Sequence, residues 1–328
     1  TSVNDAPTGA DKTVTVLEDG SYTFTATDFG FADTSDSPAN ALSAVIITSL
    51  PAAGTLKLSG TSVTLNQSIS AANIGNLVYA PAANANGLAY ASFNFKVKDD
   101  GGTANGGVDT SVSSNTITVN VTSVNDAPTG ANKTVTVLED GSYTFASSDF
   151  GFADTSDSPA NALSAVIITS LPAAGTLKLS GTSVTLNQSI SAANIGNLVY
   201  APAANANGLA YASFNFKVKD DGGTANGGVD TSVSSNTITV NVTSVNDAPT
   251  GADKTVTVLE DGSYTFTATD FGFADTSDSP ANALSAVIIT SLPAAGTLKL
   301  SGTSVTLNQS ISAANIGNLV YAPAANAN

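Results

Sequence analysis

The sequence predicts an all-β fold made of tandem β-sandwich modules arranged in a linear rod. The first observation is a repeat, because the run TSVNDAPTGADKTVTVLEDG at residues 1–20 returns almost letter for letter from Thr122 and again from Thr243. The second is that short alternating segments recur between Gly, Pro, Asn and Ser, which is typical of strands joined by turns. The third is that no long segment has apolar residues at a helical period.

The repeat spacing of 121 residues divides the chain into unit 1 (1–121), unit 2 (122–242) and a truncated unit 3 (243–328). An enzyme rarely needs near-identical copies of one site in one chain, whereas a long spacer does. Units 1 and 2 differ at only four positions, which are Asp11/Asn132, Thr25/Ala146, Ala26/Ser147 and Thr27/Ser148.

The first part of unit 1 predicts three strands. Thr13–Val16 is the first, and Ser21–Ala26 follows with Tyr22 and Phe24 on one face. The segment DFGFADTSDSPANA is a loop, and the Val-Ile-Ile run of Leu42–Thr48 after it suits a buried strand.

The next two segments, Gly54–Leu58 and Thr61–Leu65, flank a Ser-Gly pair that is typical of a hairpin turn. With them we count eight strand-like segments in the unit. A rod of tandem sandwiches enters each module at one pole and leaves at the other, which favours an odd number of full crossings. One of these two segments is therefore expected to be a short ribbon.

The last part of unit 1 begins with SISAANIGN, which predicts one short helical turn, and continues with a strand at Leu77–Ala80. Ala89–Lys98 alternates three inward apolar residues with outward Asn and Lys, and Asn115–Val121 alternates in the same way. The residues expected to face inward are Phe93, Phe95, Val97, Ile117, Val119 and Val121.

The chain is strongly acidic, with a formal net charge of −16 and no Cys, His, Met or Trp. Such a surface repels nucleic acid and anionic lipid, since both need Lys and Arg to replace counterions. It offers oxygen ligands to hard cations such as calcium.

Without His or Cys the chain has no imidazole base and no thiolate nucleophile. Paired carboxylates could still hydrolyse glycosides, but few aromatic side chains are present to hold a sugar, so no enzyme activity is expected.

The carboxylates of each unit are grouped in turns. Two like charges 4 Å apart repel by about 1 kcal/mol even in water, so such groups predict a cation that joins them. The plainer alternatives are that Asp residues in turns cap their own backbone and that Asn-Asp-Ala-Pro is only a stiff connector. Asp11 and Asp109 are expected to be solvated surface. In unit 1 the groups are Asp5, Glu18-Asp19, Asp28 with Asp33 and Asp36, and Asp99-Asp100.

The linker SVNDAP resembles the DxNDNAP junction of cadherins and the VNDAP junction of VCBS/cadherin-like repeats in giant bacterial adhesins. The phrases LEDGSYTF, FADTSDSPAN, GTLKLSGTSVTLNQSISAANIGNLVYAPAANANG and FKVKDDGGTANGGVD resemble the rest of that bacterial module. The resemblance implies Ig-like/cadherin-like modules with calcium between them. In cadherins the ligands come from an acid that ends the first strand, from the linker, and from two loops at the top of the next module.

This resemblance implies a ligand set at each junction. The cadherin linker carries an acid two places before its Asn, where this chain has Ser123 and Ser244, so one or two ions per junction are implied rather than three. At the first junction the implied ligands are Glu18, Asp19, Asn125, Asp126, Asp149, Asp154, Asp157, Asp220 and Asp221. At the second junction they are Glu139, Asp140, Asn246, Asp247, Asp270, Asp275 and Asp278.

The implied function is a non-catalytic extender region of a large secreted or cell-surface adhesin of the RTX type, exported by type I secretion and made rigid by calcium. Two alternatives are repeats that themselves bind a glycan or protein with avidity, and repeats that assemble as an extracellular matrix filament. Exposed strand positions are mostly Thr, Ser, Asn and Lys, with no evident aromatic or Arg anchor, which favours the extender.

Unit 3 lacks everything that matches Gly87–Val121, including the aromatic face that is expected to fill the core. A sandwich without those strands exposes an apolar groove and unpaired edges. We therefore expect either that the sequence is a window on a longer chain or that strands of another chain complete unit 3. No signal peptide is visible, and the absence of eighteen consecutive apolar residues predicts no membrane insertion.

Overall fold

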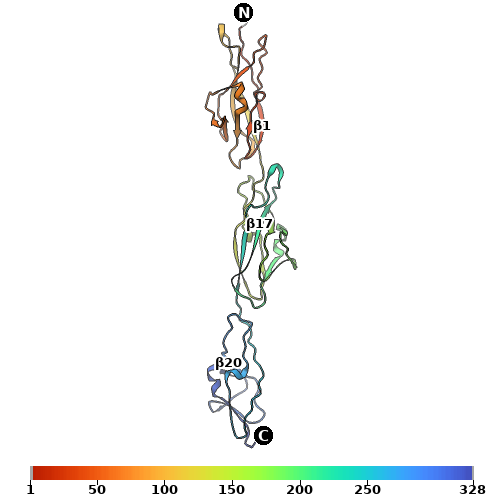
Figure 1. Ribbon diagram of the computed structural model, residues 1–328, viewed down its shortest axis with the longest axis vertical. Coiled ribbons are helices and arrows are strands. Elements are labelled where there is room, and N and C mark those ends of the chain that lie inside the picture. Colours follow the sequence, from red (N-terminus) through yellow and green to blue (C-terminus); the bar gives the residue numbers. More distant parts are fainter. Residues whose placement is uncertain (1–2, 327–328) are drawn as a thin grey trace.

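The computed structural model describes residues 3–326 and shows one unit after another along an extended rod, with the N- and C-terminal ends at opposite poles (Figure 1). Strands make up most of the regular structure, and the helices are short 3₁₀ turns labelled η. The prediction of an all-β fold of tandem sandwiches is confirmed. No helix within residues 3–326 combines the length and the apolar character that a membrane crossing requires. The unit boundaries at 121/122 and 242/243 stay a prediction.

Unit 1 contains strands that form two facing sheets. One sheet has the order β1-β9-β8-β3-β6 and the other has the order β2-β7-β4-β5. The elements are β1 (Lys12–Leu17), β2 (Tyr22–Thr23), η1 (Ala26–Phe29), β3 (Leu42–Ile47), β4 (Thr55–Leu58), β5 (Thr61–Ser62), β6 (Ser68–Ser70), η2 (Ala71–Asn76), β7 (Leu77–Ala80), β8 (Gly87–Asp99), η3 (Ala104–Gly106) and β9 (Asn115–Thr122).

The first and last strands of unit 1 lie side by side and run in the same direction. Strand β1 pairs with β9 in parallel, with Lys12 opposite Ile117 and Leu17 opposite Thr122. The other strand pairs of the unit are antiparallel. Both strands therefore end at the same pole, which is where the chain leaves the unit.

The core lies between the two sheets and depends on aromatic pairs. Phe93 and Phe95 of β8 are fully buried, as predicted from the alternation of that strand. The Phe93 ring lies 5.5 Å from the ring of Phe24, and the Phe95 ring lies 4.9 Å from that of Phe29. Both pairs are edge-to-face, an arrangement that adds to the free energy of burial. The remaining predicted inward residues, Val97, Ile117, Val119 and Val121, are also buried.

The predicted hairpin consists of β4 and the two-residue strand β5, so the expectation of a short ribbon is confirmed. The predicted strand Ser21–Ala26 is too long, since only Tyr22–Thr23 is paired. Its last part enters η1, because a carboxylate oxygen of Asp28 accepts a hydrogen bond from the Thr25 amide at 2.8 Å and closes a turn there.

The predicted helical turn SISAANIGN is only partly helical. Its first three residues form β6, which pairs with β3, and the rest forms η2. The reason is the local pattern, because Ile69 is buried while the serines on either side of it are exposed. That period of two fits a strand.

Unit 2 repeats both sheets, in the orders β10-β18-β17-β12-β15 and β11-β16-β13-β14. Its elements are β10 (Lys133–Leu138), β11 (Tyr143–Thr144), η4 (Ser147–Phe150), β12 (Leu163–Ile168), β13 (Thr176–Leu179), β14 (Thr182–Ser183), β15 (Ser189–Ser191), η5 (Ala192–Asn197), β16 (Leu198–Ala201), β17 (Gly208–Asp220), η6 (Ala225–Gly227) and β18 (Asn236–Thr243).

Unit 3 keeps the smaller sheet, β19-β24-β21-β22, but retains only β20 and β23 of the larger one. Residues 254–259, which match β1, form no strand, and residues 3–326 hold no equivalent of β9 that could pair with them. The elements are β19 (Tyr264–Thr265), η7 (Ala268–Phe271), β20 (Ala286–Ile289), β21 (Thr297–Leu300), β22 (Thr303–Ser304), β23 (Gln309–Ser312), η8 (Ala313–Asn318) and β24 (Leu319–Ala322).

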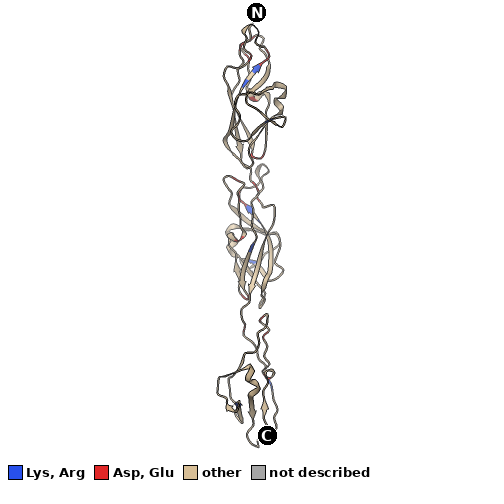
Figure 2. Cartoon of the chain, turned by 90° about the vertical axis from the view of Figure 1, so that its left-hand side faces the viewer, with Lys and Arg blue, Asp and Glu red and all other residues tan. Residues whose placement is uncertain are grey.

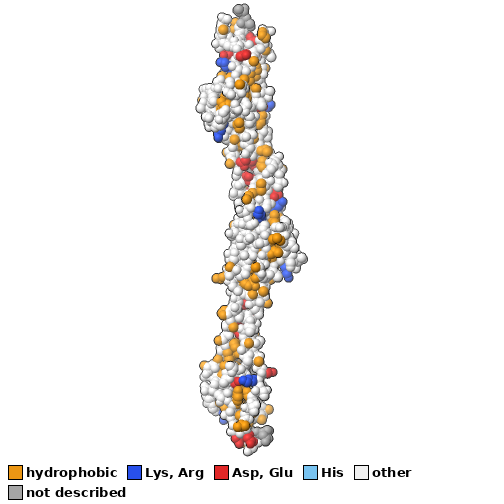
Figure 3. Space-filling view, viewed as in Figure 1, with side chains coloured by type: hydrophobic (Ala, Val, Ile, Leu, Met, Phe, Trp, Pro, Cys, Tyr) orange, Lys and Arg blue, Asp and Glu red, His pale blue; other side chains and the backbone are white. Residues whose placement is uncertain are grey.

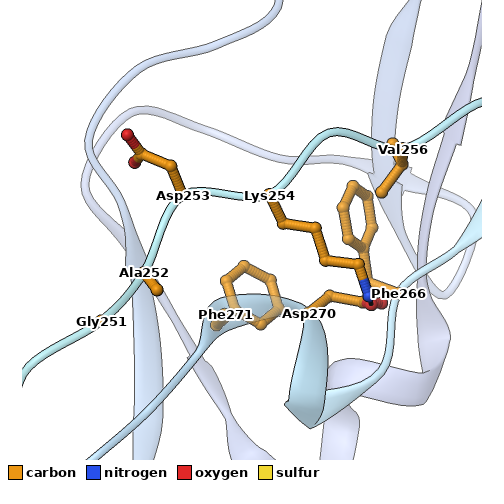
Figure 4. Close-up of a pocket in the computed structure, with 8 residues that line it drawn as sticks. All are labelled: Gly251, Ala252, Asp253, Lys254, Val256, Phe266, Asp270 and Phe271. Carbon is orange, nitrogen blue, oxygen red and sulfur yellow. Dashed lines mark hydrogen bonds and ion pairs between the residues drawn. The ribbon is translucent and has the colours of Figure 1, made fainter.

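The groove predicted in unit 3 is present as an open cavity of about 490 Å³ (Figure 4). Phe266 and Phe271 line it, and they match Phe24 and Phe29, whose ring partners come from β8 in unit 1. The neighbouring strand β20 carries Ile288, which is 62% exposed. Completion of this unit by strands of another chain stays a prediction.

Truncation of the matching aromatic residues in units 1 and 3 is expected to have unequal effects. Phe29→Ala leaves a cavity beside Phe95, which costs about 3–5 kcal/mol of the free energy of unfolding. Phe271→Ala is expected to cost much less, because the Phe271 side chain is already half-buried. Urea unfolding of each full-length variant, followed by circular dichroism, measures both effects. Equal losses would contradict the assignment of the cavity to the missing partners of these rings.

Candidate metal centre at the unit junctions

Each junction begins where two parallel strands end together. Leu17, the last residue of β1, lies opposite Thr122, the last residue of β9. The Glu18 amide then donates to the Thr122 carbonyl oxygen at 2.9 Å. This pairing places the Glu18 side chain beside the linker that follows β9, although more than a hundred residues separate them in the sequence.

The unit that follows the junction, which is unit 2 at the first junction, contributes acids from two loops. Asp154 and Asp157 lie in the loop between η4 and β12, and Asp220 is the last residue of β17. All three side chains are buried, with Asp220 only 1% exposed. Two carboxylates hold this loop. Asp154 accepts from the Asn161 amide within the loop at 2.5 Å, and Asp221, which follows β17, accepts from the Ala162 amide at 2.8 Å.

Asn125 and Asp126 bind the linker to the following unit, which is unit 2 at the first junction. The Asn125 side-chain amide donates to Asp220 and to the Val229 carbonyl oxygen, at 3.0 and 2.9 Å. The Asp126 backbone amide donates to the Asp157 carboxylate at 3.1 Å. Gly222 permits this approach, because a Cβ at that position would lie only 1.8 Å from the side-chain oxygen of Asn125.

Three carboxylates meet at each junction, one each from the preceding unit, the linker and the following unit. The ligand oxygens of Glu18, Asp126 and Asp157 lie within 4.8 Å of one another, and Glu139, Asp247 and Asp278 form the same group at the second junction. Figure 3 shows acidic side chains at the narrow junction between units 1 and 2. Oxygen ligands lie about 2.3–2.6 Å from calcium, so oxygens this close together can share one ion.

Several carboxylate oxygens in and beside the group are buried without a hydrogen-bond partner among the described residues. Burial without a partner is unfavourable for any polar atom and more so for a charged one. The chemistry of these atoms therefore fits a hard cation. At the first junction they are Asp126 Oδ2, Asp154 Oδ1 and Asp220 Oδ2, and at the second they are Asp247 Oδ2 and Asp275 Oδ1.

The electrostatics of the first junction oppose ionisation of its acids. Burial, together with neighbouring Asp154 and Asp126, raises the pKa of Asp157 to about 6. Burial and the nearby charges of Asp19, Glu18 and Asp154 raise the pKa of Asp126. A bound cation would favour the charged forms of both groups.

The structure brings together some of the sequence-predicted ligands and leaves others apart. Glu18, Asp126 and Asp157 form the first group, with Asp154, Asp220 and Asn125 beside it, and Glu139, Asp247 and Asp278 form the second, with Asp275 and Asn246 beside it. Asp19, Asp140 and Asp221 lie outside both groups and accept hydrogen bonds from the amides of Asn84, Asn205 and Ala162.

Asp149 and Asp270 are the predicted ligands whose carboxylates have other partners. Asp149 accepts from the Ala146 amide at 2.9 Å and lies 3.8 Å from the Lys133 ammonium. The Lys254 ammonium lies 2.6 Å from Asp270 and lowers the pKa of that carboxyl. Both residues cap a 3₁₀ turn, the plainer reading of an Asp in a turn.

Sequence reasoning missed the asparagines that donate hydrogen bonds to Glu18 and Asn125 at the junction. Asn86 donates to Glu18 at 3.0 Å, and Asn161 donates to Asn125 at 2.5 Å. The repeated PAANANG loop, in which Asn86 lies, was the available signal, but a search for charged residues passes over it. The expectation that Asp109 is solvated surface is wrong, because it forms an ion pair with Lys98 at 3.0 Å. Figure 2 shows blue Lys positions along the chain within the units.

Comparison with known proteins gives one family match. The profile of the family described as "Bacterial Ig domain" matches residues 4–122 and 125–243. No curated protein sequence matches the chain.

Among solved structures, mouse cadherin-23 EC22-24 aligns at 14% identity over 98% of this chain and 90% of its own, with a TM-score of 0.42. Drosophila N-cadherin EC1-4 aligns at 11% identity over 96% of this chain and 64% of its own, with a TM-score of 0.38. Human mucin-like protocadherin EC1-2 aligns at 14% identity over 74% of this chain and all of its own, with a TM-score of 0.36. Scores of this size carry no argument about function.

The raised pKa of Asp157 predicts a pH dependence in chelator-treated protein. Between the usual carboxyl pKa of about 3.9 and the folded value of about 6, the folded state holds a proton that the unfolded state has released. The contribution of Asp157 to stability is therefore present at pH 4 and is lost as the pH rises through 6. Asp157→Asn should remove it, so the variant gains stability relative to the wild type over this window. Urea unfolding in chelator from pH 4 to 7 measures the difference. A difference that does not change with pH would contradict the assignment.

Proposed function

The chain belongs to the bacterial Ig-domain family, and from this premise we propose that it is a non-catalytic extender made rigid by calcium bound at its unit junctions. In this proposal the chain is part of a large secreted or cell-surface adhesin of the RTX type, exported by type I secretion. The repeats hold a distal binding region away from the cell. No step of the function requires a catalytic group.

One observation carries the proposal. Three acids meet at both junctions, one from the preceding unit, one from the linker and one from the following unit. Their oxygens lie within 4.8 Å of one another. Three such charges repel, so without a cation the junction is driven open. A cation bound by all three carboxylates replaces their repulsion with attraction to the ion, and it joins the two units directly.

The size of the effect follows from mass action. A site filled at ten to a hundred times its dissociation constant stabilises the bound state by about 1.4–2.7 kcal/mol. That is enough to favour one junction geometry over a hinged ensemble. Oxygen sites of extracellular modules bind calcium at about 10⁻⁴–10⁻³ M, a concentration found outside cells. This supports the proposal that the repeats work outside the cell.

Loss of the linker acids is expected to abolish the calcium-induced stiffening. Asp126→Asn with Asp247→Asn removes one carboxylate from each group and keeps the size of each side chain. Small-angle scattering of the wild type should show a maximum dimension that falls when calcium is chelated. The double variant in calcium should already have the shorter dimension, and calorimetry should show weaker calcium binding.

Asp11→Asn is the matched control. It makes the same chemical change away from the junction, and unit 2 already carries Asn132 at that position. This control should behave as the wild type does in both measurements. A scattering profile of the wild type that does not change on chelation would exclude the proposal, and so would equal effects of Asp126→Asn and Asp11→Asn.

A further inference from the structure

Both oxygens of the Glu18 carboxylate accept hydrogen bonds from the chain itself, and three donors still leave room for one further ligand on Oε2. Its Oε1 accepts from the Val124 backbone amide at 2.5 Å and from the Ser123 hydroxyl at 3.3 Å. Its Oε2 accepts from the side-chain amide of Asn86 at 3.0 Å. The residue is only 3% exposed.

The second junction repeats these contacts. Glu139 accepts from the Val245 amide at 2.5 Å, from the Ser244 hydroxyl at 3.2 Å and from Asn207 at 3.0 Å. These donors lower the pKa of Glu139, with the Asn207 hydrogen bond as the largest cause. In unit 3, where the described residues include no linker after the unit, the matching Glu260 is exposed.

We propose that Glu18 and Glu139 are latch residues, which fasten the following linker to their own unit without any cation. Asn86 and Asn207 are positioning residues, since each orients the carboxylate that holds the linker. The serine at this linker position, where cadherins carry an acid, donates to the latch. The latch goes beyond the proposed calcium function and does not depend on it, because all of its donors belong to the chain itself.

The latch restricts where the junction bends. It ties Val124 to unit 1, whereas Asn125 and Asp126 are tied to unit 2 by their bonds to Asp220 and Asp157. The freely rotating part of the linker is therefore reduced to the bonds between Val124 and Asn125. A short hinge of this kind limits how far repulsion can separate the three junction carboxylates before an ion binds.

The test measures amide exchange at Val124 and Val245 in the presence of a chelator. Peptides that begin within β9 or β18 contain these amides and exclude the matching Val3, so both junctions are read together. In the wild type the two amides should be protected. Glu18→Ala with Glu139→Ala should speed their exchange by about tenfold or more, as expected for loss of a hydrogen bond to a charged group.

Two further pairs of variants separate the latch from a charge effect and from misfolding. Glu18→Gln with Glu139→Gln removes the charge but keeps an acceptor, and Asn86 and Asn207 can turn their amides to match, so most of the protection should remain. Asn86→Ala with Asn207→Ala should give an intermediate loss. Protection of β8 and β17 reports whether each variant is folded.

The latch is overturned if the wild-type amides exchange in chelator as fast as those of the Ala variant, or if the Gln variant exchanges as fast as the Ala variant. Asp126→Asn with Asp247→Asn should leave both amides protected, because these acids are not in the latch. Failure of the calcium proposal leaves these results unchanged, so the two inferences fail separately.

Discussion

The parallel pairing of the first and last strands of each unit is the constraint on which the rest of the structure depends. Because β1 and β9 run in the same direction, the acid that follows the first strand and the linker that follows the last strand emerge at the same pole. Unit 3 shows the consequence of losing the pair. Within residues 3–326 this unit has no equivalent of β9, residues 254–259 form no strand, and Glu260 is exposed. One pairing therefore shapes both the sandwich and its junction.

The junction combines two kinds of contact with different physics. Hydrogen bonds from the chain's own amides and hydroxyls hold the linker to the unit on either side of it, and they act at any calcium concentration. The carboxylates of Glu18, Asp126 and Asp157 face one another across the short link between those contacts. Their repulsion opens the junction and a shared cation closes it, so in this account the stiffness of the rod is set by the solution.

Much of the fold could be predicted from the sequence, because in strands such as β8 and β9 the alternation of apolar and polar residues indicates which side chains are buried. The early end of β2 and the presence of β6 could not be predicted, since the first depends on a carboxylate that closes a turn and the second on a single buried Ile. The acids of the junction were predicted from a resemblance to cadherin-like repeats. The structure was needed to separate the acids that meet at the junction from those that have other partners. Asp149 has the spacing of a ligand, yet a turn amide and Lys133 occupy it. Asn86 was missed because it carries no charge to draw attention to it.

The distance distribution between spin labels on neighbouring units tests the central claim most directly. The chain has no Cys, so Thr61→Cys and Thr182→Cys, which lie at exposed positions of β5 and β14, give a unique pair of attachment sites. With calcium the distribution should be narrow and single. In chelator it should broaden, as the units turn about the link between Val124 and Asn125, and calcium should restore it. Equal widths with and without calcium would contradict the claim that a cation shared by the junction carboxylates makes the rod rigid.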